Sequence, residues 1–295
     1  MNNKHYNVLG MPAPNVSPLE LEIALQAALQ SAFTEHEFYL DYQPQCNIKG
    51  TLLGAEALVR WHHPQQGILQ PSDFLDSLER FGLMQTLNLW LIDQVCQLLQ
   101  HLHQAVSSDL ALSFNLPLAQ LYTQGFIDQL AVYIERYAIP ADKLVIELLG
   151  NNELFSDEII LAELERLRAL GIGLSIDHFG ENYQLLALLK DLPLTQIKIP
   201  GELIQALAKP EASQLVEHLI LIAKALNMNI VAEHVETAEQ FKQLEELGCP
   251  ALQGFYLFSP MSEKKFLIVS KQLTEIRRSY TDVDKEAFCP IDNKR

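Results

Sequence analysis

The sequence is poor in basic residues, and that shortage excludes a class of partner. Of its 295 residues, 21 are lysine or arginine and 37 are aspartate or glutamate, so the formal net charge is −16 at pH 7. A non-specific nucleic-acid-binding protein normally carries the opposite charge. We therefore expect no DNA or RNA partner, and an anionic ligand would need help from metal ions or from a few well-placed cations.

Cysteines are also few, and the chain has no long apolar segment. No two of the cysteines form a CxxC pair; they are Cys46, Cys96, Cys249 and Cys289. This scatter is typical of buried or unreactive thiols in a reducing compartment. The first residues lack the apolar core of a signal peptide, and no apolar run is long enough to span a bilayer. We therefore expect a cytoplasmic protein with no direct membrane span.

The chain does contain enough apolar residues, 48% of the total, to build a sizeable core. Residues 1–16 hold two prolines and show little periodicity, which predicts a flexible N-terminal tail. The polar residues 279–295 predict a C-terminal tail. Between them, residues 17–278 show no internal repeat, low-complexity segment or linker, so we expect one domain.

Strand-like apolar runs alternate with helical patterns along this domain. The predicted strands cover 38–44, 52–61, 110–116, 143–149, 172–177, 195–199, 229–233 and 251–255. The predicted helices cover about 17–33, 84–106, 126–137, 156–171, 182–190, 211–226, 237–248 and 263–278. Continuous apolar strands that alternate with helices favour a parallel sheet. Eight such strands favour an α/β fold that closes into a single TIM-like (β/α)8 barrel.

Three helix starts carry recognisable capping residues. Ser17 with Glu20, and Thr237 with Gln240, have the spacing of a capping box. Ser156 is the expected cap of the helix over 156–171, which has acids in its first turn.

Polar residues interrupt the apolar strands near their C-terminal ends. They are Glu56, Asn115, Glu147, Asp177, Lys198, Glu233 and Gln253. In a barrel these ends converge on the face where such enzymes carry their chemistry. Four carboxylates gathered there would repel one another unless a cation balanced them. An oxygen-rich set of this kind suits Mg²⁺ or Mn²⁺.

With two metal ions, such a site could clamp both oxygens of a phosphodiester while water attacks in line. Lys198 could orient that water or neutralise phosphate charge. Taken singly, each residue has an ordinary alternative. An acid near a strand end is about as often a helix cap or a salt-bridge partner as a metal ligand. A lysine is more often solvated or paired with an acid than part of a functional site. The joint pattern is what favours a site, because so many strands end in the same way.

The stretch GAEALVRWHHPQQGILQPSDF, residues 54–74, resembles the signature of EAL domains, which are phosphodiesterases that open cyclic di-GMP to linear pGpG. Shorter motifs follow in the family's order: YQP at 42–44, SFN at 113–115, IE at 146–147, D-x-F-G at 177–180, IKI at 197–199, AE-x-VE at 232–236 and QG at 253–254. The resemblance covers roughly residues 19–270. It implies a (β/α) barrel with an unusual first strand.

The resemblance also implies roles for individual residues. The ligands of a first metal would be Glu56, Asn115, Glu147 and Asp177. Glu233 would hold a second metal, bridged by Asp177, while Lys198 would contact the catalytic water and Glu236 would support the site. The nucleotide would be contacted by Gln43, Leu58, Arg60, Gln253 and Pro260. For Arg60 the alternative is a surface salt bridge.

Several positions depart from the family pattern, and the first is His178. The family has two adjacent aspartates where this chain has Asp177 and His178, and the second one helps to hold the second metal. A neutral histidine nitrogen can still ligate a metal, but it brings no negative charge, so the site would be weaker for Mg²⁺ and could be limited to one ion. In the alternative interpretation, His178 only hydrogen-bonds a neighbour.

The other departures lie near the same loop. Where the family shows a Thr-Gly pair followed by serines, this chain has Glu181, Asn182 and Gln184. Gly150 stands where family enzymes keep a glutamate that braces the loop, and Leu149 replaces a threonine. Pro200 replaces an aspartate and His234 replaces a glycine. The positions matching the first metal site are intact.

Three functions therefore stay open. The first is a degenerate EAL domain that binds cyclic di-GMP, or a protein partner, with weak or absent hydrolysis. The second is an active metal-dependent phosphodiesterase in which His178 is an accepted variant ligand. The third is a protein-interaction module that no longer binds nucleotide. Intact first-metal positions and Arg60 favour ligand contact, and the altered loop favours weak hydrolysis. The sequence leaves the protein partner and a homodimer open.

Overall fold

The computed structural model describes residues 17–106, 109–176 and 189–281. The chain divides into two compact units. Unit 1 comprises Met1–Asp41 and Leu58–Gln94, and unit 2 comprises Tyr42–Ala57 and Val95–Arg295. Several predictions fall outside the described residues. They concern the outer parts of the two tails (1–16 and 282–295), Asp177 and His178, and most of the helix over 182–190.

The strands match the predicted positions closely and add short ones. Their bounds are β1 Phe38–Cys46, β2 Leu52–His63, β3 Gly67–Leu69, β4 Ala111–Pro117, β5 Leu144–Leu149, β6 Gly173–Ile176, β7 Gln196–Ile199, β8 Asn229–Ala232, β9 Ala251–Leu252 and β10 Met261–Ser262.

The helices likewise follow the predicted order. Their bounds are α1 Pro18–Thr34, α2 Pro71–Arg80, α3 Met84–Ala105, η2 Leu118–Tyr122, α4 Phe126–Tyr137, η3 Ala141–Lys143, α5 Asn152–Phe155, α6 Glu158–Ala169, α8 Gly201–Gln205, α9 Pro210–Ala225, α10 Ala238–Glu246 and α11 Glu263–Thr281. Among the described helices, we find none with the length and hydropathy needed to cross a membrane.

Unit 1 is organised around aromatic side chains. The ring of Phe38 lies 5.5 Å from the rings of both Trp61 and Phe74, measured between centroids. The indole nitrogen of Trp61 donates a hydrogen bond of 2.9 Å to Glu37, so its polar edge is satisfied. Within this unit β2 and β3 form an antiparallel pair, with Trp61 opposite Leu69.

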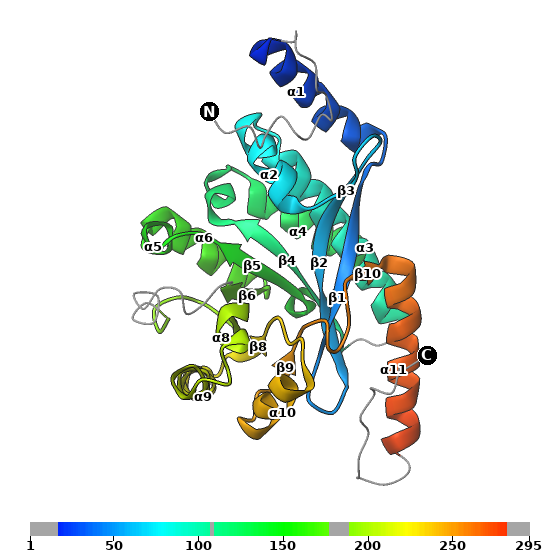
Figure 1. The fold of residues 1–295 in the computed structure, drawn as a ribbon. Helices are drawn as coiled ribbons and strands as arrows, with labels where there is room; N and C mark the ends of the chain where they lie inside the picture. Colours follow the sequence, from blue (N-terminus) through cyan, green and yellow to red (C-terminus); the bar gives the residue numbers. More distant parts are fainter. Residues whose placement is uncertain (1–16, 107–108, 177–188, 282–295) are drawn as a thin grey trace. The chain divides into compact units, whose positions relative to one another are not determined.

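Unit 2 contains the barrel. The strands β2, β4, β5, β6, β7, β8 and β9 are successive parallel neighbours, and β1 closes the ring by pairing with both β9 and β2. The pairing of β1 with β9 is antiparallel, which is the unusual first strand that the resemblance implied. Helices such as α6, α9 and α10 lie outside the strands (Figure 1). The prediction of a closed TIM-like barrel is thus confirmed.

The capping predictions are confirmed at two helices and wrong at one. Both capping boxes are present, from Ser17 with Glu20 and from Thr237 with Gln240. The cap of α6, however, is Asp157 rather than Ser156. The Asp157 carboxylate accepts hydrogen bonds from the backbone N–H groups of Ile159 and Ile160 at 2.9 and 3.1 Å. The short helix α5, which was not predicted, ends just before this point, and α6 covers Glu158–Ala169 of the helix predicted over 156–171.

Candidate functional site

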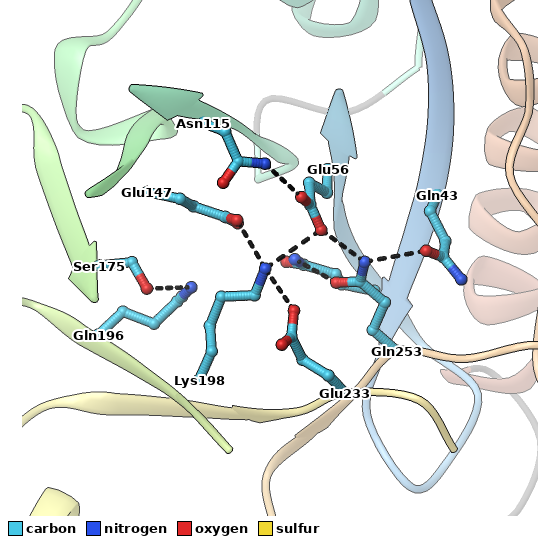
Figure 2. A network of polar contacts seen from close by, with 10 residues as sticks. Gln43, Glu56, Asn115, Glu147, Ser175, Gln196, Lys198, Glu233 and Gln253 are labelled. Atoms are coloured by element: carbon cyan, nitrogen blue, oxygen red, sulfur yellow. Dashed lines mark hydrogen bonds and ion pairs between the residues drawn. The ribbon is translucent and has the colours of Figure 1, made fainter. Parts of the chain in front are cut away.

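Lys198 lies at the centre of a group of carboxylates inside the barrel (Figure 2). Its side chain is 1% exposed, and its Nζ atom lies 2.6 Å from Glu147, 2.5 Å from Glu233 and 3.1 Å from Glu56. The three acids are each less than 10% exposed. Glu56, Glu147 and Lys198 come from β2, β5 and β7, and Glu233 directly follows β8. The strand ends therefore do bring these predicted residues together.

Asn115 and Gln253 extend this group on either side of Glu56. Asn115 Nδ2 donates to Glu56 Oε1 at 2.7 Å, and Gln253 Nε2 donates to Glu56 Oε2 at 2.7 Å. Because β4 and β5 are in parallel register, Asn115 pairs directly with Glu147. Both oxygens of Glu56 are thus held by amide donors, and the Lys198 ammonium contacts one of them as well.

A chain of amide side chains continues from Gln253. Its Nε2 atom also donates to Gln43 Oε1 at 3.1 Å, and its Oε1 atom accepts from Gln45 Nε2 at 2.9 Å. Gln43 in turn donates to the backbone carbonyl of Phe258 at 3.3 Å. This arrangement fixes the amide of Gln253, since its oxygen faces a donor and its nitrogen faces two acceptors.

The acids of the group differ in how easily they ionise. Burial opposes ionisation of Glu56, but the Lys198 charge and the hydrogen bonds from Gln253, Lys198 and Asn115 hold its pKa below the usual range. Burial raises the pKa of Glu147 well above its usual value, and the neighbouring charge of Glu56 adds to the rise. One ammonium among three carboxylates leaves an excess of negative charge, which favours a proton on Glu147 in the metal-free molecule.

The donor set fits a hard divalent cation in two respects. The Oε1 atom of Glu147 and the Oδ1 atom of Asn115 are buried and have no hydrogen-bond partner within the described residues. Carboxylate and amide oxygens are the ligands that Mg²⁺ and Mn²⁺ prefer. In the described part of the chain, no three His, Cys, Asp or Glu side chains form a ready metal cluster, and Asp177 lies outside it. Here the ammonium of Lys198 offsets part of the negative charge of the acids.

Other predicted site residues lie elsewhere. Glu236 is exposed, and in the described residues no hydrogen bond or ion pair joins its carboxylate to Lys198 or Glu56. Pro260 is half-buried, just before β10. Leu58 and Arg60 belong to unit 1, where Arg60 is buried, pairs with Asp41 at 3.3 Å and donates to the carbonyl of Val59. Arg60 is therefore not the surface salt bridge of the alternative interpretation, and its contact with a nucleotide stays a prediction.

At two positions that depart from the family pattern, Gly150 and His234, the structure shows close packing against a neighbouring residue. A Cβ atom on Gly150 would lie 2.6 Å from Cδ1 of Leu118, so the space that a glutamate would need is partly filled by leucine. A Cβ atom on Gly201 would lie 2.6 Å from the ring of His234. His234 has φ of 52°, in the left-handed region where histidine is enriched among non-glycine residues.

Sequence reasoning missed Gln45 and the pair formed by Ser175 and Gln196. Gln196 donates to the Ser175 hydroxyl at 3.3 Å, and both side chains are buried in the barrel. The signal for Gln45 was available, since it lies two residues after Gln43 and alternate residues of a strand face the same side. The predicted strand ended at residue 44, two residues before the end of β1 at Cys46.

Comparison with known proteins identifies relatives over most of the chain. The EAL domain family matches residues 26–260. The bifunctional diguanylate cyclase/cyclic di-GMP phosphodiesterase MucR of Pseudomonas aeruginosa is 33% identical over 248 residues, which cover 83% of this chain and 36% of that protein. The cyclic di-GMP phosphodiesterase RocR of the same organism is 33% identical over 233 residues, covering 78% of this chain and 59% of that protein.

Solved structures show the same likeness. The MucR phosphodiesterase in complex with c-di-GMP superposes with a TM-score of 0.77 at 33% identity, over 82% of this chain and 99% of that one. The EAL enzyme Bd1971, with cAMP and cyclic di-GMP bound, gives a TM-score of 0.79 at 28% identity, over 90% and 72%. The chain spans about a third of the length of the first curated relatives that it matches. On this evidence, the protein belongs to the EAL domain family.

Proposed function

We propose that the chain binds cyclic di-GMP at the carboxylate end of the barrel and hydrolyses it slowly or not at all. The observation that carries the binding half of the proposal is the buried group around Lys198. Glu56 and Asn115 are already hydrogen-bonded to each other, and Glu147 offers an unpartnered oxygen. These are the residues that an oxygen-liganded metal and a phosphodiester would need.

Bound Mg²⁺ or Mn²⁺ would supply Lewis-acid stabilisation of the phosphodiester and of an attacking water. The residues that would hold a first ion are Glu56, Asn115, Glu147 and Asp177. Glu233 would serve a second ion. Lys198 would hold a proton beside these acids and offer its ammonium to the phosphate, while Gln253 keeps Glu56 in one orientation.

Slow hydrolysis is supported by the sequence departures near the second metal. His178 brings no negative charge to a position that has an aspartate in the family, which weakens a site for a hard cation. The close approach between Gly150 and Leu118 leaves little room at this position for the glutamate that the family keeps. As part of the same proposal we place the protein in the cytoplasm, since Cys46 and Cys249 carry reduced, buried thiols.

Titration calorimetry with cyclic di-GMP separates binding from turnover in one preparation. We expect a micromolar or tighter dissociation constant with Ca²⁺, which corresponds to about 8 kcal/mol. Repeating the titration with Mn²⁺, and following pGpG by chromatography, measures hydrolysis. Brisk turnover would replace this proposal with an active phosphodiesterase. No heat and no thermal shift at millimolar nucleotide would replace it with a protein-interaction module.

A further inference from the structure

The barrel has a second polar hollow, at the end opposite to Lys198. It is a cavity of about 460 Å³ lined by the N-terminal residues of the strands. Ala111 begins β4 four residues before Asn115, and Gln196 begins β7 two residues before Lys198. The function proposed above does not use this cavity, although its lining residue Gln45 is hydrogen-bonded to Gln253 of the carboxylate group. The inference drawn from the cavity does not rest on that function.

Several of the residues that line the hollow are small. TIM barrels are normally filled by layers of bulky branched residues. Here the lining includes Ala111, Gly173 and Ala251. Gly173 has no spare room toward its neighbours, because an added Cβ would lie 3.0 Å from Val145 Cγ2 and 3.3 Å from Thr195 Oγ1. A hollow of this size is large enough to hold a small molecule.

Buried polar groups face this hollow. Ser113 is 3% exposed, and its hydroxyl oxygen has no hydrogen-bond partner among the described residues. Gln45 and Gln196 also line the cavity and are 9% and 8% exposed. Their amide nitrogens are held by Gln253 and Ser175, so both amides are fixed in orientation. A buried hydroxyl without a partner is destabilising unless something bound there pairs with it.

The charges at the mouth point to an uncharged occupant. Lys143 pairs with Asp142 at 3.8 Å, and the Arg168 guanidinium donates to the carbonyl of Ile172 at 2.5 Å. Asp109 and Asp142 line the cavity together with Lys143 and Arg168, so the charges of its lining side chains sum to zero and favour neither an anion nor a cation. Val145 and Val231 provide apolar walls between the amides. Apolar walls with a few convergent polar groups are typical of small-molecule sites.

We propose that this cavity binds a small uncharged molecule with amide-like hydrogen-bonding edges, in the size range of a nucleobase or nucleoside. Glutamine and asparagine amides offer a donor and an acceptor side by side, which matches the edge of a base. The Ser113 hydroxyl contributes either a hydrogen-bond donor or an acceptor inside the cavity. The cavity volume lies within the range of sites for such ligands.

Saturation-transfer NMR on the full chain, with adenosine, guanosine, cytidine and uridine as probes, tests this inference. At least one nucleoside should bind the wild type. Ala111→Leu fills the hollow and should abolish that signal, whereas Ala169→Leu, at an exposed alanine of α6, should leave it unchanged. Ser113→Ala should weaken binding by up to about tenfold, the effect of one lost hydrogen bond.

Thermal unfolding shows whether each variant is folded, so that a loss of binding can be separated from a loss of structure. Ser113→Ala removes an unpaired hydroxyl, so its melting temperature should equal or exceed that of the wild type. If Ala111→Leu fails to fold, Ser113→Ala alone decides the matter. Absence of binding by all four nucleosides would mean that the cavity holds only water and would overturn the proposal. A binding signal that stays unchanged in both Ala111→Leu and Ser113→Ala would also overturn the proposal, because the nucleoside would then bind at another site, such as the carboxylate end of the barrel. Titration with cyclic di-GMP should be unaffected by Ser113→Ala.

Discussion

The Nζ atom of Lys198 lies 2.6 Å from Oε2 of Glu147, and neither side chain is more than 1% exposed. A buried pair of this kind is costly to break from one side, because the remaining charge has no water to solvate it. The Lys198 ammonium also serves Glu56 and Glu233. It is therefore the positive charge on which the acids of the barrel depend when no metal ion is bound.

Lys198→Met should lower the free energy of unfolding by about 3–5 kcal/mol in the presence of EDTA, because it leaves these buried acids uncompensated. Urea unfolding followed by circular dichroism measures the change. Lys242→Met is the matched control: it removes an exposed partner of Glu246, 3.9 Å away, and should cost less than about 1 kcal/mol. Added Mn²⁺ should stabilise Lys198→Met more than wild type, and equal stabilisation of both would contradict a cation site at these acids.

The pH dependence of the free energy of unfolding should reflect the raised pKa of Glu147. Its pKa is raised in the folded state, first by burial and then by the charge of Glu56. Its stabilising contribution is therefore fully present below the unfolded value of 4.5 and is lost as the pH rises through the folded pKa. Glu147→Gln should reduce this loss of unfolding free energy with rising pH, measured by urea unfolding without metal ions. Glu153→Gln, at an exposed position of α5, should not, and identical slopes in all three proteins would refute the assignment.

Hydrolysis should respond to His178 and Gly150 together. His178→Asp restores an anionic ligand, and Gly150→Glu restores a brace for the loop, so the double variant should produce pGpG with Mg²⁺ faster than either single variant. Metal affinity and ligand orientation are separate requirements of a two-metal site. Chromatography of the wild type and the three variants measures the rates. A brisk wild-type rate that falls in His178→Asp would make His178 a working part of an active enzyme.

Gly150→Glu should also cost stability, because its Cβ would lie 2.6 Å from Leu118 Cδ1. Overpacking of this kind typically costs about 1–3 kcal/mol. Leu118→Ala opens the space, so the two changes together should destabilise the protein by less than the sum of their separate effects. A double-mutant cycle by urea unfolding gives the coupling energy. Strict additivity would mean that Leu118 moves aside freely.

Arg60 offers a test of nucleotide contact within unit 1. Arg60→Ala should weaken cyclic di-GMP binding by about 1.5–3 kcal/mol if the guanidinium donates to the ligand. Asp41→Asn is the control, since it removes the negative partner 3.3 Å away and keeps the guanidinium in place. Calorimetry should show a much smaller loss for Asp41→Asn. Equal losses would mean that the ion pair, and no direct contact, determines affinity.

Local patterns predicted the helices and strands well where the signal is confined to neighbouring residues. The Ser17 and Thr237 capping boxes depend on residues three apart, and both formed as expected. Asp157 was passed over for Ser156 because both are good caps, and only the short helix α5 decides between them. Helix α2 was missed, although Pro71 in its first turn and Asp73, which accepts from the Gln70 N–H, mark its start.

The carboxylate group was predictable because parallel strands place their C-terminal ends together. That rule says nothing about which side chains neutralise one another, so the sequence could not show that Lys198 pairs with three acids. Nor could it show the contact of Gly150 with Leu118, which joins residues from different strand–helix units. The cavity near Ser113 depends on the sizes of side chains from eight strands, and no local sequence pattern contains that information.

The crowding between Gly201 and His234 imposes an order on how this part of the barrel can change. While the imidazole keeps its present position, any side chain at position 201 would begin 2.6 Å from the ring, so His234 must shift or be replaced before position 201 can accept another residue. Once His234→Gly has occurred, the space opens and position 201 becomes free to vary. The two positions are therefore coupled, and a combinatorial library that randomises position 201 alone would miss the alternatives that depend on a change at position 234.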